Sequence, residues 1–481
     1  MCGLAGIFRP DGQPPITGDL DAMAHIMRHR GPDGTEIYRH PNDKYHAVFN
    51  RLAIIDLETG DQPIVEENGR RILMGNGEIY NYVELRQDEN AYPYQTKGDM
   101  EVVLPLATRY GIDFVDHLEG MYGLSLYEAE DHRLTLVRDR FGIKPLYWAQ
   151  SKPGGCVIFA SEIKAIFASG LIEPEIDSDM VPTYLAHGYV PAPETIFKGI
   201  HKLPPAHRAV VNRGGQVLIE RYWRGGQAST SIHSANDAVE QLDDLLSRSI
   251  AQQLRSDVPV GALLSGGLDS GLIVAHAAKQ SSRPLKTFTV RFQGARVDES
   301  PLAQQVAERY ETDHHLLEVS ASDVVQDLPK LAWFMEEPSN DASVYPNYLI
   351  EQVLGSHVRV ALNGTGGDEL FAGYRRYDDF DCPLAAASGA KRKLWRTLRL
   401  AGLLADRSLN DSDLQRYFAY EGCLNDDDQI PLLGASFRAN LKDSASSTLA
   451  RFFRRDLAPV DAARYADMNL YLVDHILTKV D

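Results

Sequence analysis

A cysteine stands at the second position of the chain, behind the initiator methionine and before a small glycine. Removal of Met1 leaves a thiol and a free α-amine on one residue, Cys2. Because the pKa of an α-amine, about 7.7–8.0, lies near neutral pH, the amine can act as general base for the thiol of its own residue. Taken alone, an incidental cysteine near a terminus is the simpler interpretation, so other residues must decide between the two.

Polar and charged residues elsewhere in the N-terminal part can complete such a site. The segment Asn76–Glu78 follows a strand expected at Arg71–Met74. Its amide side chain and a backbone N–H can hold a tetrahedral oxyanion, where each donor contributes about 3 kcal/mol. The same Asn-Gly pair is also typical of a plain hairpin turn. Arg51 can bind a carboxylate with two hydrogen bonds, and Glu78 with Asp99 can hold an ammonium group.

Two glycine-rich turns in the C-terminal part can bind phosphate. The first, Ser265–Ser270 (SGGLDS), follows an apolar strand expected at Val258–Leu264 and opens a helix. Glycines let the backbone approach an anion, and helix N-terminal N–H groups with two hydroxyls form a cradle, although a purely structural turn is the alternative. The turn lacks the GxxxxGK[ST] pattern of a Walker loop. The second turn, Asn363–Glu369 (NGTGGDE), also follows a strand, so Asp269 and Asp368 can meet at one sheet edge and share Mg²⁺.

The elements that must position these residues differ between the two parts of the chain. Residues 1–210 show short strands separated by Gly, Asp and Asn turns, which predicts an α+β layered domain. Strand patterns cover Val48–Leu57, Arg71–Met74, Met121–Tyr127, Leu134–Arg138 and Cys156–Ala160. Helical periodicity covers Asp19–Met27, Met100–Tyr110 and Glu162–Ala168.

A polar segment, residues 211–236, carries Arg-Gly-Gly sequences and a Ser/Thr cluster and is expected to link this domain to the next. Beyond it, in residues 237–481, helical and strand patterns alternate. The helices are expected at Ala238–Leu254, Gly271–Lys279 and Pro301–Tyr310, and the strands at Val258–Leu264, Leu285–Phe292, His315–Val319 and Val358–Leu362. This alternation predicts an α/β doubly wound parallel sheet, followed by a helical part beyond Gly373.

Composition excludes several classes of protein. The chain has 481 residues and a net charge of −18, which argues against a nucleic-acid partner. No apolar stretch approaches the ~20 residues of a membrane helix, and the N-terminus lacks the features of a signal peptide. Four scattered cysteines without a CxxC pair exclude a disulfide scaffold and a cysteine zinc site. We therefore expect a soluble, cytoplasmic protein without a membrane partner.

Five segments, together with Asp99-Met100-Glu101, resemble the N-terminal-nucleophile glutaminase domain of glutamine-dependent asparagine synthetases. They are Met1–Phe8, Arg28–Asp33, Arg51–Asp56, Asn76–Asn81 and Arg138–Tyr147. The resemblance implies an αββα fold in which Cys2 attacks the side-chain amide of glutamine and releases ammonia through a thioester. It makes Asn76 and Gly77 the oxyanion hole, and it assigns the glutamine pocket to Arg51, Ile54, Glu78 and Asp99.

The SGGLDS turn resembles the pyrophosphate loop of the ATP-pyrophosphatase fold, which forms the synthetase domain of the same family. The resemblance implies ATP and Mg²⁺, and attack of a carboxylate on the α-phosphorus to give an acyl-adenylate and pyrophosphate, after which ammonia displaces AMP. Carried over by position, the nucleotide-binding residues are Leu264, Ser265, Gly266, Gly267, Asp269, Ser270, Val290, Asn363 and Gly364, and the metal ligands are Asp269 and Asp368.

The sequence departs from the family in two places. Thr365 stands where the family usually has an acidic residue, which predicts a weaker or differently organised synthetase reaction. The last residues, Tyr471–Asp481, show helical spacing without a stop signal, and the family continues past this point to a later lysine. We therefore expect a complete glutaminase half and a synthetase half that is cut short.

Three hypotheses remain open at this point. The leading one is a glutamine-hydrolysing asparagine synthetase with glutamine and aspartate as substrates and ammonia passed inside the protein. Because the segment Glu336–Pro346 does not specify aspartate, the second hypothesis changes the acceptor to another carboxylate. The third is a non-synthetic protein that keeps the glutaminase fold as a binding module. The family resemblance also suggests a homodimer.

Overall fold

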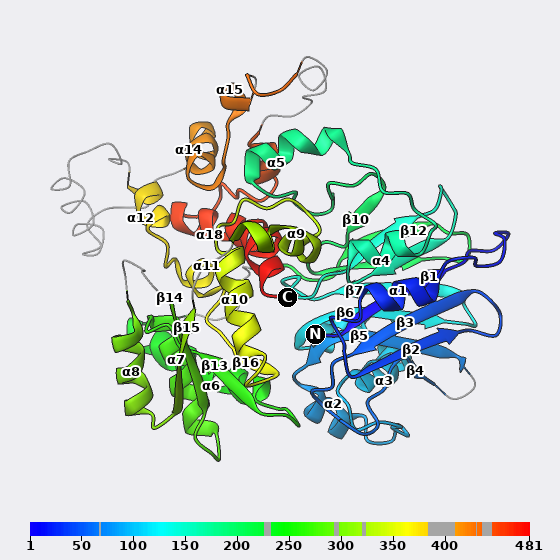
Figure 1. Cartoon of the computed structure of the whole chain (residues 1–481), viewed down its shortest axis with the longest axis horizontal. Coiled ribbons are helices and arrows are strands. Elements are labelled where there is room, and N and C mark those ends of the chain that lie inside the picture. Colours follow the sequence, from blue (N-terminus) through cyan, green and yellow to red (C-terminus); the bar gives the residue numbers. More distant parts are fainter. Residues whose placement is uncertain are drawn as a thin grey trace.

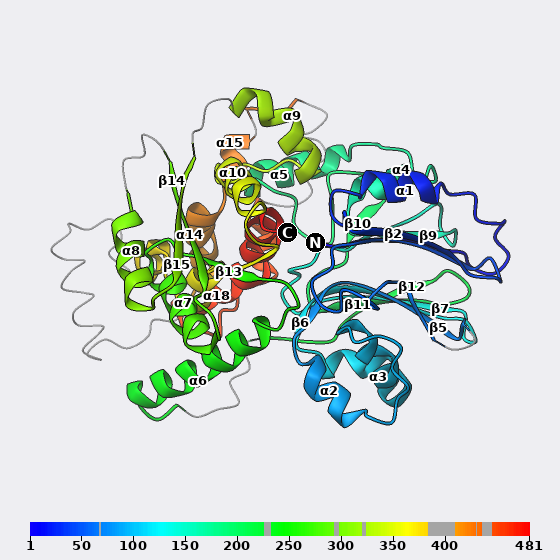
Figure 2. The same ribbon diagram turned by 60° about the horizontal axis from the view of Figure 1, so that its bottom comes forward.

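Two six-stranded antiparallel sheets, stacked face to face, form the N-terminal half of the molecule (Figure 2). The structure is a computed structural model and describes residues 1–66, 69–225, 232–292, 298–319, 324–382, 409–429, 431–434 and 445–481. The first sheet has the order β10-β8-β9-β1-β3-β2, with β1 Gly3–Phe8, β2 Gly34–Arg39, β3 Tyr45–Arg51, β8 Tyr147–Gln150, β9 Val157–Ala160 and β10 Ile200–Lys202. The second has the order β12-β11-β7-β6-β5-β4, with β4 Ile64–Val65, β5 Arg71–Ile79, β6 Gly120–Glu128, β7 Arg133–Arg138, β11 His207–Val211 and β12 Val217–Arg221.

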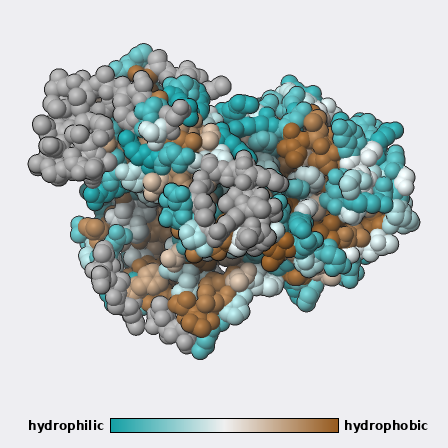
Figure 3. Space-filling view, turned by 90° about the horizontal axis from the view of Figure 1, so that it is seen from above, coloured by the Kyte–Doolittle hydropathy of each residue, from teal (hydrophilic) through white to brown (hydrophobic). Residues whose placement is uncertain are grey.

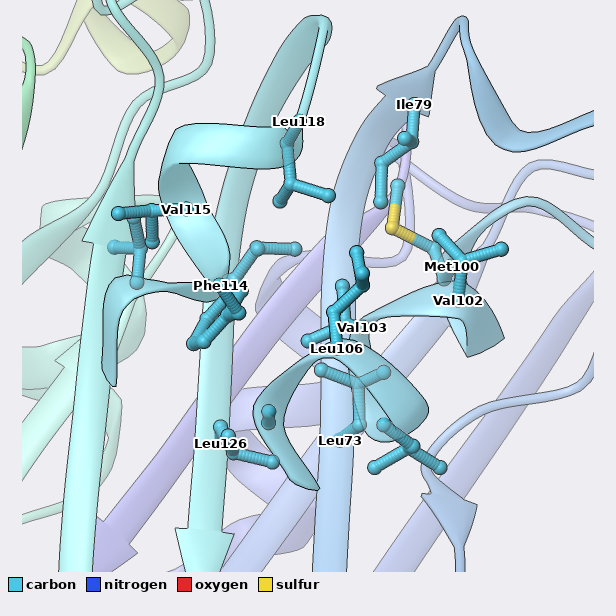
Figure 4. Packing of buried hydrophobic residues seen from close by; sticks show 14 of the residues in the cluster. Leu73, Ile79, Met100, Val102, Val103, Leu106, Phe114, Val115, Leu118 and Leu126 are labelled. Atoms are coloured by element: carbon cyan, nitrogen blue, oxygen red, sulfur yellow. The ribbon is translucent and has the colours of Figure 1, made fainter. Parts of the chain in front are cut away.

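Helices cover the outer face of each sheet and complete four layers (Figure 2). The helices outside the first sheet are α1 Leu20–Ile26 and α4 Ile163–Ala168, and those outside the second are α2 Tyr82–Asp88, η2 Met100–Val102, α3 Val103–Tyr110 and η3 Gly111–His117. Helix α1 begins where Asp19 accepts a hydrogen bond from the backbone N–H of Ala22. Figure 4 shows Met100, Val103 and Phe114 packed from the helices onto β5 and β6. This αββα arrangement confirms the layered fold expected from the sequence.

Three segments of this half differ from the expectation. The strand expected at Val48–Leu57 runs over Tyr45–Arg51 instead, and residues 52–57 form a loop. The strand expected to end at Met74 continues to Ile79, and residues of the Asn-Gly segment pair with β6 instead of forming a hairpin turn. Gly77 makes this possible, because its φ is +137° and a Cβ atom there would lie 1.9 Å from the carbonyl oxygen of Met121. In addition, β12 falls within the range 211–236 expected as a linker. Strand pairing therefore carries the first half to Arg221.

A four-stranded parallel sheet forms the core of the C-terminal half (Figure 1). Its order is β15-β14-β13-β16, with β13 Val260–Leu263, β14 Lys286–Phe292, β15 Asp313–Val319 and β16 Val360–Leu362. One face packs against α6 Ala235–Gln253, α7 Leu268–Gln280 and α8 Ser300–Arg309, and the other against α10 Val344–Leu354. Helices on both faces confirm the doubly wound sheet.

The remaining described elements are helical, and in Figure 1 most of them lie above the parallel sheet, toward the top of the view. They are η4 Ser178–Met180, α5 Val181–His187, α9 Val324–Met335, α11 Gly367–Phe371, α12 Arg375–Asp381, α14 Asp411–Glu421, α15 Asp426–Gln429, α17 Ser447–Ala450, α18 Pro459–Asn469, η5 Leu472–Ile476 and η6 Leu477–Lys479. Within the described residues this agrees with the helical part expected beyond Gly373; residues 383–408, 430 and 435–444 lie outside them.

The polarity of the surface, the character of the helices and the state of the cysteines can be compared with what the composition predicts. On the face shown in Figure 3, hydrophobic residues form separate patches between hydrophilic areas. Among the helices that the structure describes, none has the length and apolar character needed to cross a bilayer. All four cysteines are free, as expected for a chain without a disulfide scaffold.

Candidate active site

Cys2 lies at the entry to the central strand β1 and lines an open pocket whose empty volume, including solvent space at its mouth, is about 430 Å³. The backbone N–H of Leu52 donates a hydrogen bond to its Sγ at 3.3 Å, and Sγ donates to the carbonyl oxygen of the same residue at 3.5 Å. Burial raises the pKa of the Cys2 thiol, although the Leu52 hydrogen bond opposes this shift. The thiol is therefore protonated at neutral pH and needs a base before it can act as a nucleophile.

The chain terminus provides an amine beside this thiol. Burial, together with the nearby charge of Arg30, lowers the pKa of the Met1 α-amine to about 6. An amine in this environment is neutral at pH 7 and can accept a proton. Excision of Met1 would place an α-amine on Cys2 itself.

Asn76 and Gly77 lie next to each other on β5. Gly77 lines the pocket, whereas Asn76 does not line it and is only 1% exposed. Both polar atoms of the Asn76 amide lack a hydrogen-bond partner. Because an unpartnered buried amide costs about 1–3 kcal/mol, such a group is typical of a place where a ligand completes the hydrogen bond.

The four residues that the sequence assigned to glutamine also meet in this pocket. Arg51, Ile54, Glu78 and Asp99 all line it. Arg51 is held by an ion pair between its Nη1 and Asp61 at 2.9 Å. A guanidinium has five N–H donors, so this pairing leaves donors for a carboxylate.

The half-buried Glu78 and the buried Asp99 form a pair of acids at one side of the pocket. Burial, with the neighbouring Asp99, raises the pKa of Glu78 well above its ordinary value. Burial raises the pKa of Asp99 to about 6, although the N–H of Ile79 donates to its Oδ2 at 2.7 Å. Within the described part of the chain neither acid has an ion-pair partner. A ligand ammonium group would supply the missing positive charge.

Sequence reasoning did not single out two residues that contact Cys2. One is Leu52, whose contribution is its backbone, so no side-chain pattern could have indicated it. The other is Arg30, whose Nε donates to the carbonyl oxygen of Cys2 at 3.0 Å. Arg30 belongs to the quoted segment Arg28–Asp33, and its type alone did not indicate this contact.

The first glycine-rich turn joins β13 to the N-terminus of α7. The hydroxyls of Ser265 and Ser270 lie 2.9 Å apart, and the N–H of Gly267 donates to Ser265 Oγ at 3.2 Å. Gly266 has a φ of +86°, and a Cβ there would lie 3.0 Å from the carbonyl oxygen of Glu299. The loop is thus shaped by its own hydroxyls and glycines at a helix N-terminus, where backbone N–H groups attract anions.

The second turn lies against the first, as expected for adjacent parallel strands. A Cβ atom at Gly367 would lie 2.6 Å from Asp269 Oδ2, and one at Gly364 would lie 3.1 Å from Asp269 Cβ. Burial, followed by the charge of Asp368, raises the pKa of Asp269. Neither carboxylate has an ion-pair partner in the described residues. Two unbalanced carboxylates at a phosphate loop suit Mg²⁺, whereas no cluster of three or more His, Cys, Asp or Glu occurs among these residues.

The other residues assigned to the nucleotide lie around these turns. Leu264 is buried, and its N–H donates to the carbonyl oxygen of Phe288 at 2.8 Å. Val290 is half-buried on β14, next to β13. Asn363 Oδ1 accepts from the N–H of Thr365 at 3.0 Å, which stabilises the second turn. The structure therefore brings most residues of each predicted set close together, one set in each half, while Asn76 does not line the pocket.

Comparison with known proteins matches both halves. A family described as glutamine amidotransferase domain matches residues 1–223, and one described as asparagine synthase matches residues 241–481. A Bacillus subtilis protein named glutamine-hydrolysing asparagine synthetase 1 is 33% identical over 427 residues, which are 86% of this chain and 66% of that protein.

Two further relatives carry similar names. A Mycobacterium tuberculosis protein named putative glutamine-hydrolysing asparagine synthetase is 36% identical over 78% of this chain and 61% of its own length. A Methanocaldococcus jannaschii protein named putative glutamine-hydrolysing asparagine synthetase 2 is 34% identical over 78% of this chain and 76% of its own length. The chain thus spans 66% and 61% of the length of the first two of these relatives.

Proposed function

We propose a function from the premise that the chain belongs to the family of glutamine-hydrolysing asparagine synthetases. It hydrolyses glutamine at Cys2 and uses ATP to transfer the ammonia to aspartate, forming asparagine, AMP and pyrophosphate. The observation that carries this proposal is the pocket lined by Cys2, Gly77 and the acids Glu78 and Asp99, with the partnerless amide of Asn76 adjacent in the chain to Gly77.

Glutamine hydrolysis follows from the groups around Cys2. The α-amine of Cys2 takes the thiol proton, and Sγ attacks the amide carbon of glutamine. Asn76 and the N–H of Gly77 stabilise the tetrahedral oxyanion. Ammonia leaves, and water hydrolyses the thioester to glutamate. Arg51 binds the substrate carboxylate, while Glu78 and Asp99 bind its ammonium group.

Amide synthesis takes place at the two glycine-rich turns. A carboxylate oxygen of aspartate attacks the α-phosphorus of ATP and displaces pyrophosphate, and ammonia then attacks the acyl carbon and displaces AMP. The N–H groups and hydroxyls of Ser265–Ser270 bind the phosphates. Asp269 and Asp368 would hold Mg²⁺, which when bound neutralises phosphate charge. The use of ATP supports a cytoplasmic location, and the family resemblance supports a homodimer.

The test measures AMP, pyrophosphate and asparagine with ATP, Mg²⁺, aspartate and either glutamine or ammonia. We expect all three products from both nitrogen sources. The variant Cys2→Ala should lose the glutamine-dependent reaction and keep the ammonia-dependent one. Formation of ADP and phosphate would contradict the proposal. Glutamine hydrolysis without AMP formation from aspartate would show that the acceptor is another carboxylate.

A further inference from the structure

The C-terminal residues of the described chain reach the nucleophile of the other half. Figures 1 and 2 show the two chain ends side by side between the halves. The Asp481 carboxylate accepts a hydrogen bond from Arg30 Nη2 at 2.5 Å and from Lys144 Nζ at 3.1 Å. Its side chain is only 6% exposed. A charged group of the synthetase half is therefore buried against the glutaminase half.

Arg30 connects this carboxylate to Cys2. Its Nε donates to the carbonyl oxygen of Cys2 at 3.0 Å, and its Nη1 contacts Glu162 at 3.3 Å. Arg30 is 9% exposed, so its charge is balanced by these protein groups and not by water. Burial alone would raise the pKa of Asp481, but Arg30 and Lys144 hold it at about 2, so the carboxylate is ionised at neutral pH. Removing that charge would leave Arg30 with one acidic partner.

Asp481 is itself held firmly by its own half. Two residues before it, Lys479 Nζ donates to Asp341 Oδ2 at 2.6 Å and to Ser343 Oγ at 2.7 Å. Leu477, on the short helix η6, belongs to an apolar cluster that also includes Phe141 of the glutaminase half. The carboxylate therefore meets Arg30 from an anchored segment.

We propose that Asp481 is a positioning residue for the glutaminase nucleophile and acts through Arg30. By fixing the guanidinium, Asp481 fixes the peptide plane of Cys2 and thereby the direction of its α-amine and Sγ toward the pocket. The inference rests on the proposed glutaminase function. Small displacements of a reacting group can cost about 10²-fold in rate, so loosening this contact should lower kcat more than it raises KM.

The main experiment compares the glutaminase kinetics of Asp481→Asn, Asp481→Glu and the wild-type protein. We expect Asp481→Asn to lower kcat about tenfold with the KM for glutamine changed less than twofold, and Asp481→Glu to restore at least half of the lost kcat. Glu84→Gln is the matched control, because Glu84 also pairs with an arginine of the other half, Arg255, at 2.6 Å, without contacting Arg30 or Cys2. Its kcat should stay within twofold of the wild type.

A double-mutant cycle tests whether Asp481 acts through Arg30. Arg30→Lys keeps the charge but loses the guanidinium geometry, and adding Asp481→Asn to it should lower kcat less than twofold further. The inference would be overturned if the two substitutions lowered kcat by factors that multiply in the double variant. It would also be overturned if Asp481→Asn lowered the melting temperature and left kcat unchanged. If Asp481→Asn does not fold, Asp481→Glu takes its place in the cycle. Its effect on kcat is then measured in the wild-type protein and in the Arg30→Lys variant, and the two effects are compared by the same criterion. Absence of glutaminase activity in the wild type would instead contradict the proposed function.

Discussion

The buried amide of Asn76 has no hydrogen-bond partner, and this allows a structural role of the residue to be distinguished from a catalytic one. A buried amide that serves the fold is normally hydrogen-bonded, and its removal destabilises the protein. Asn76 makes no such bond, so its polar atoms contribute nothing favourable to folding that the structure shows. We therefore propose that these polar atoms act in a state that contains a ligand.

We predict that Asn76→Ala lowers the glutaminase kcat by about 10²–10³-fold, because one donor to the oxyanion is lost. The KM for glutamine should change little, and the melting temperature should stay the same or rise. Steady-state kinetics and thermal unfolding of the same preparation measure both. An Asn76→Ala variant with a lower melting temperature and a normal kcat would show that the amide stabilises the fold and does not take part in catalysis.

The paired acids Glu78 and Asp99 predict a pH dependence of glutamine binding. Burial raises the pKa of Asp99 to about 6 and raises that of Glu78 well above its ordinary value, so Asp99 takes up a proton as the pH falls through about 6. The ligand ammonium binds more tightly where Asp99 is ionised. Affinity should therefore weaken as the pH drops through about 6 and level off at higher pH. Calorimetric titration of Cys2→Ala with glutamine, in which no chemistry occurs, measures this.

The variant Asp99→Asn serves as the comparison in that titration. It removes one acid and so should weaken binding at pH 8 by about tenfold while making the affinity less dependent on pH. Affinity that stays constant from pH 5 to 8 in the Cys2→Ala protein would show that these acids do not bind the ammonium group.

Among the elements, the sequence predicted the types and order of the strands and helices better than their ends. The Asn-Gly pair at residue 76 is a strong turn signal, yet β5 continues, because tertiary packing against Met121 decides the conformation of Gly77. The segment around β12 is polar since β12 is an edge strand, with Leu218 53% exposed, and this composition suggested a linker. Motif residues were predictable from their own types, whereas partners such as Leu52 and Asp481 depend on how distant segments pack.

One helix end depends on a residue of the opposite half. The N–H groups of Ile163 and Lys164, at the start of α4, donate to Glu336 at 2.8 and 2.7 Å. An acid at a helix N-terminus is favourable, but this one is buried next to Glu162. Burial raises the pKa of Glu336 to about 7, although Lys164 opposes the shift.

This contact predicts how stability changes with pH. Because the folded pKa lies above the ordinary value, the folded state binds this proton more tightly than the unfolded state. The contribution of Glu336 is therefore complete below pH about 4.5 and is lost as the pH rises through about 7, a change on the order of 1–3 kcal/mol. In the Glu336→Gln variant, the free energy of unfolding should therefore fall less between pH 5 and 8 than in the wild type, as measured by denaturant unfolding.

The neighbouring carboxylate provides a control for that measurement. Glu337 accepts from Lys202 Nζ at 2.8 Å and from the N–H of Ile196 at 2.9 Å, and it does not contact α4. Glu337→Gln should lower stability over the whole range, because the buried Lys202 loses its charged partner. If the free energy of unfolding of the Glu336→Gln variant falls with rising pH as steeply as that of the wild type, Glu336 does not cause this pH dependence.

In the molecule as a whole, the synthetase half holds the loop that forms one wall of the glutamine pocket. Asp257, just before β13, accepts from the N–H of Asp56 at 2.7 Å and donates its own N–H to the carbonyl oxygen of Ile54 at 3.0 Å. Arg359, just before β16, pairs with Asp33 at 2.5 Å and donates to the carbonyl oxygen of Ala53 at 3.3 Å. The two glycine-rich turns lie at the opposite, carboxyl ends of the same strands.

This arrangement predicts that weakening the contact affects one reaction and not the other. The double variant Asp257→Ala/Arg359→Ala frees the loop that carries Ile54, so the KM for glutamine should rise about five- to tenfold. Ammonia-dependent AMP formation should stay within twofold of the wild type, because the turns that bind ATP are at the far ends of β13 and β16. Glu84→Gln, which breaks the contact with Arg255 but removes no bond to the loop that carries Ile54, should leave both reactions unchanged. An unchanged glutamine KM with slower AMP formation would instead show that the contact serves the parallel sheet.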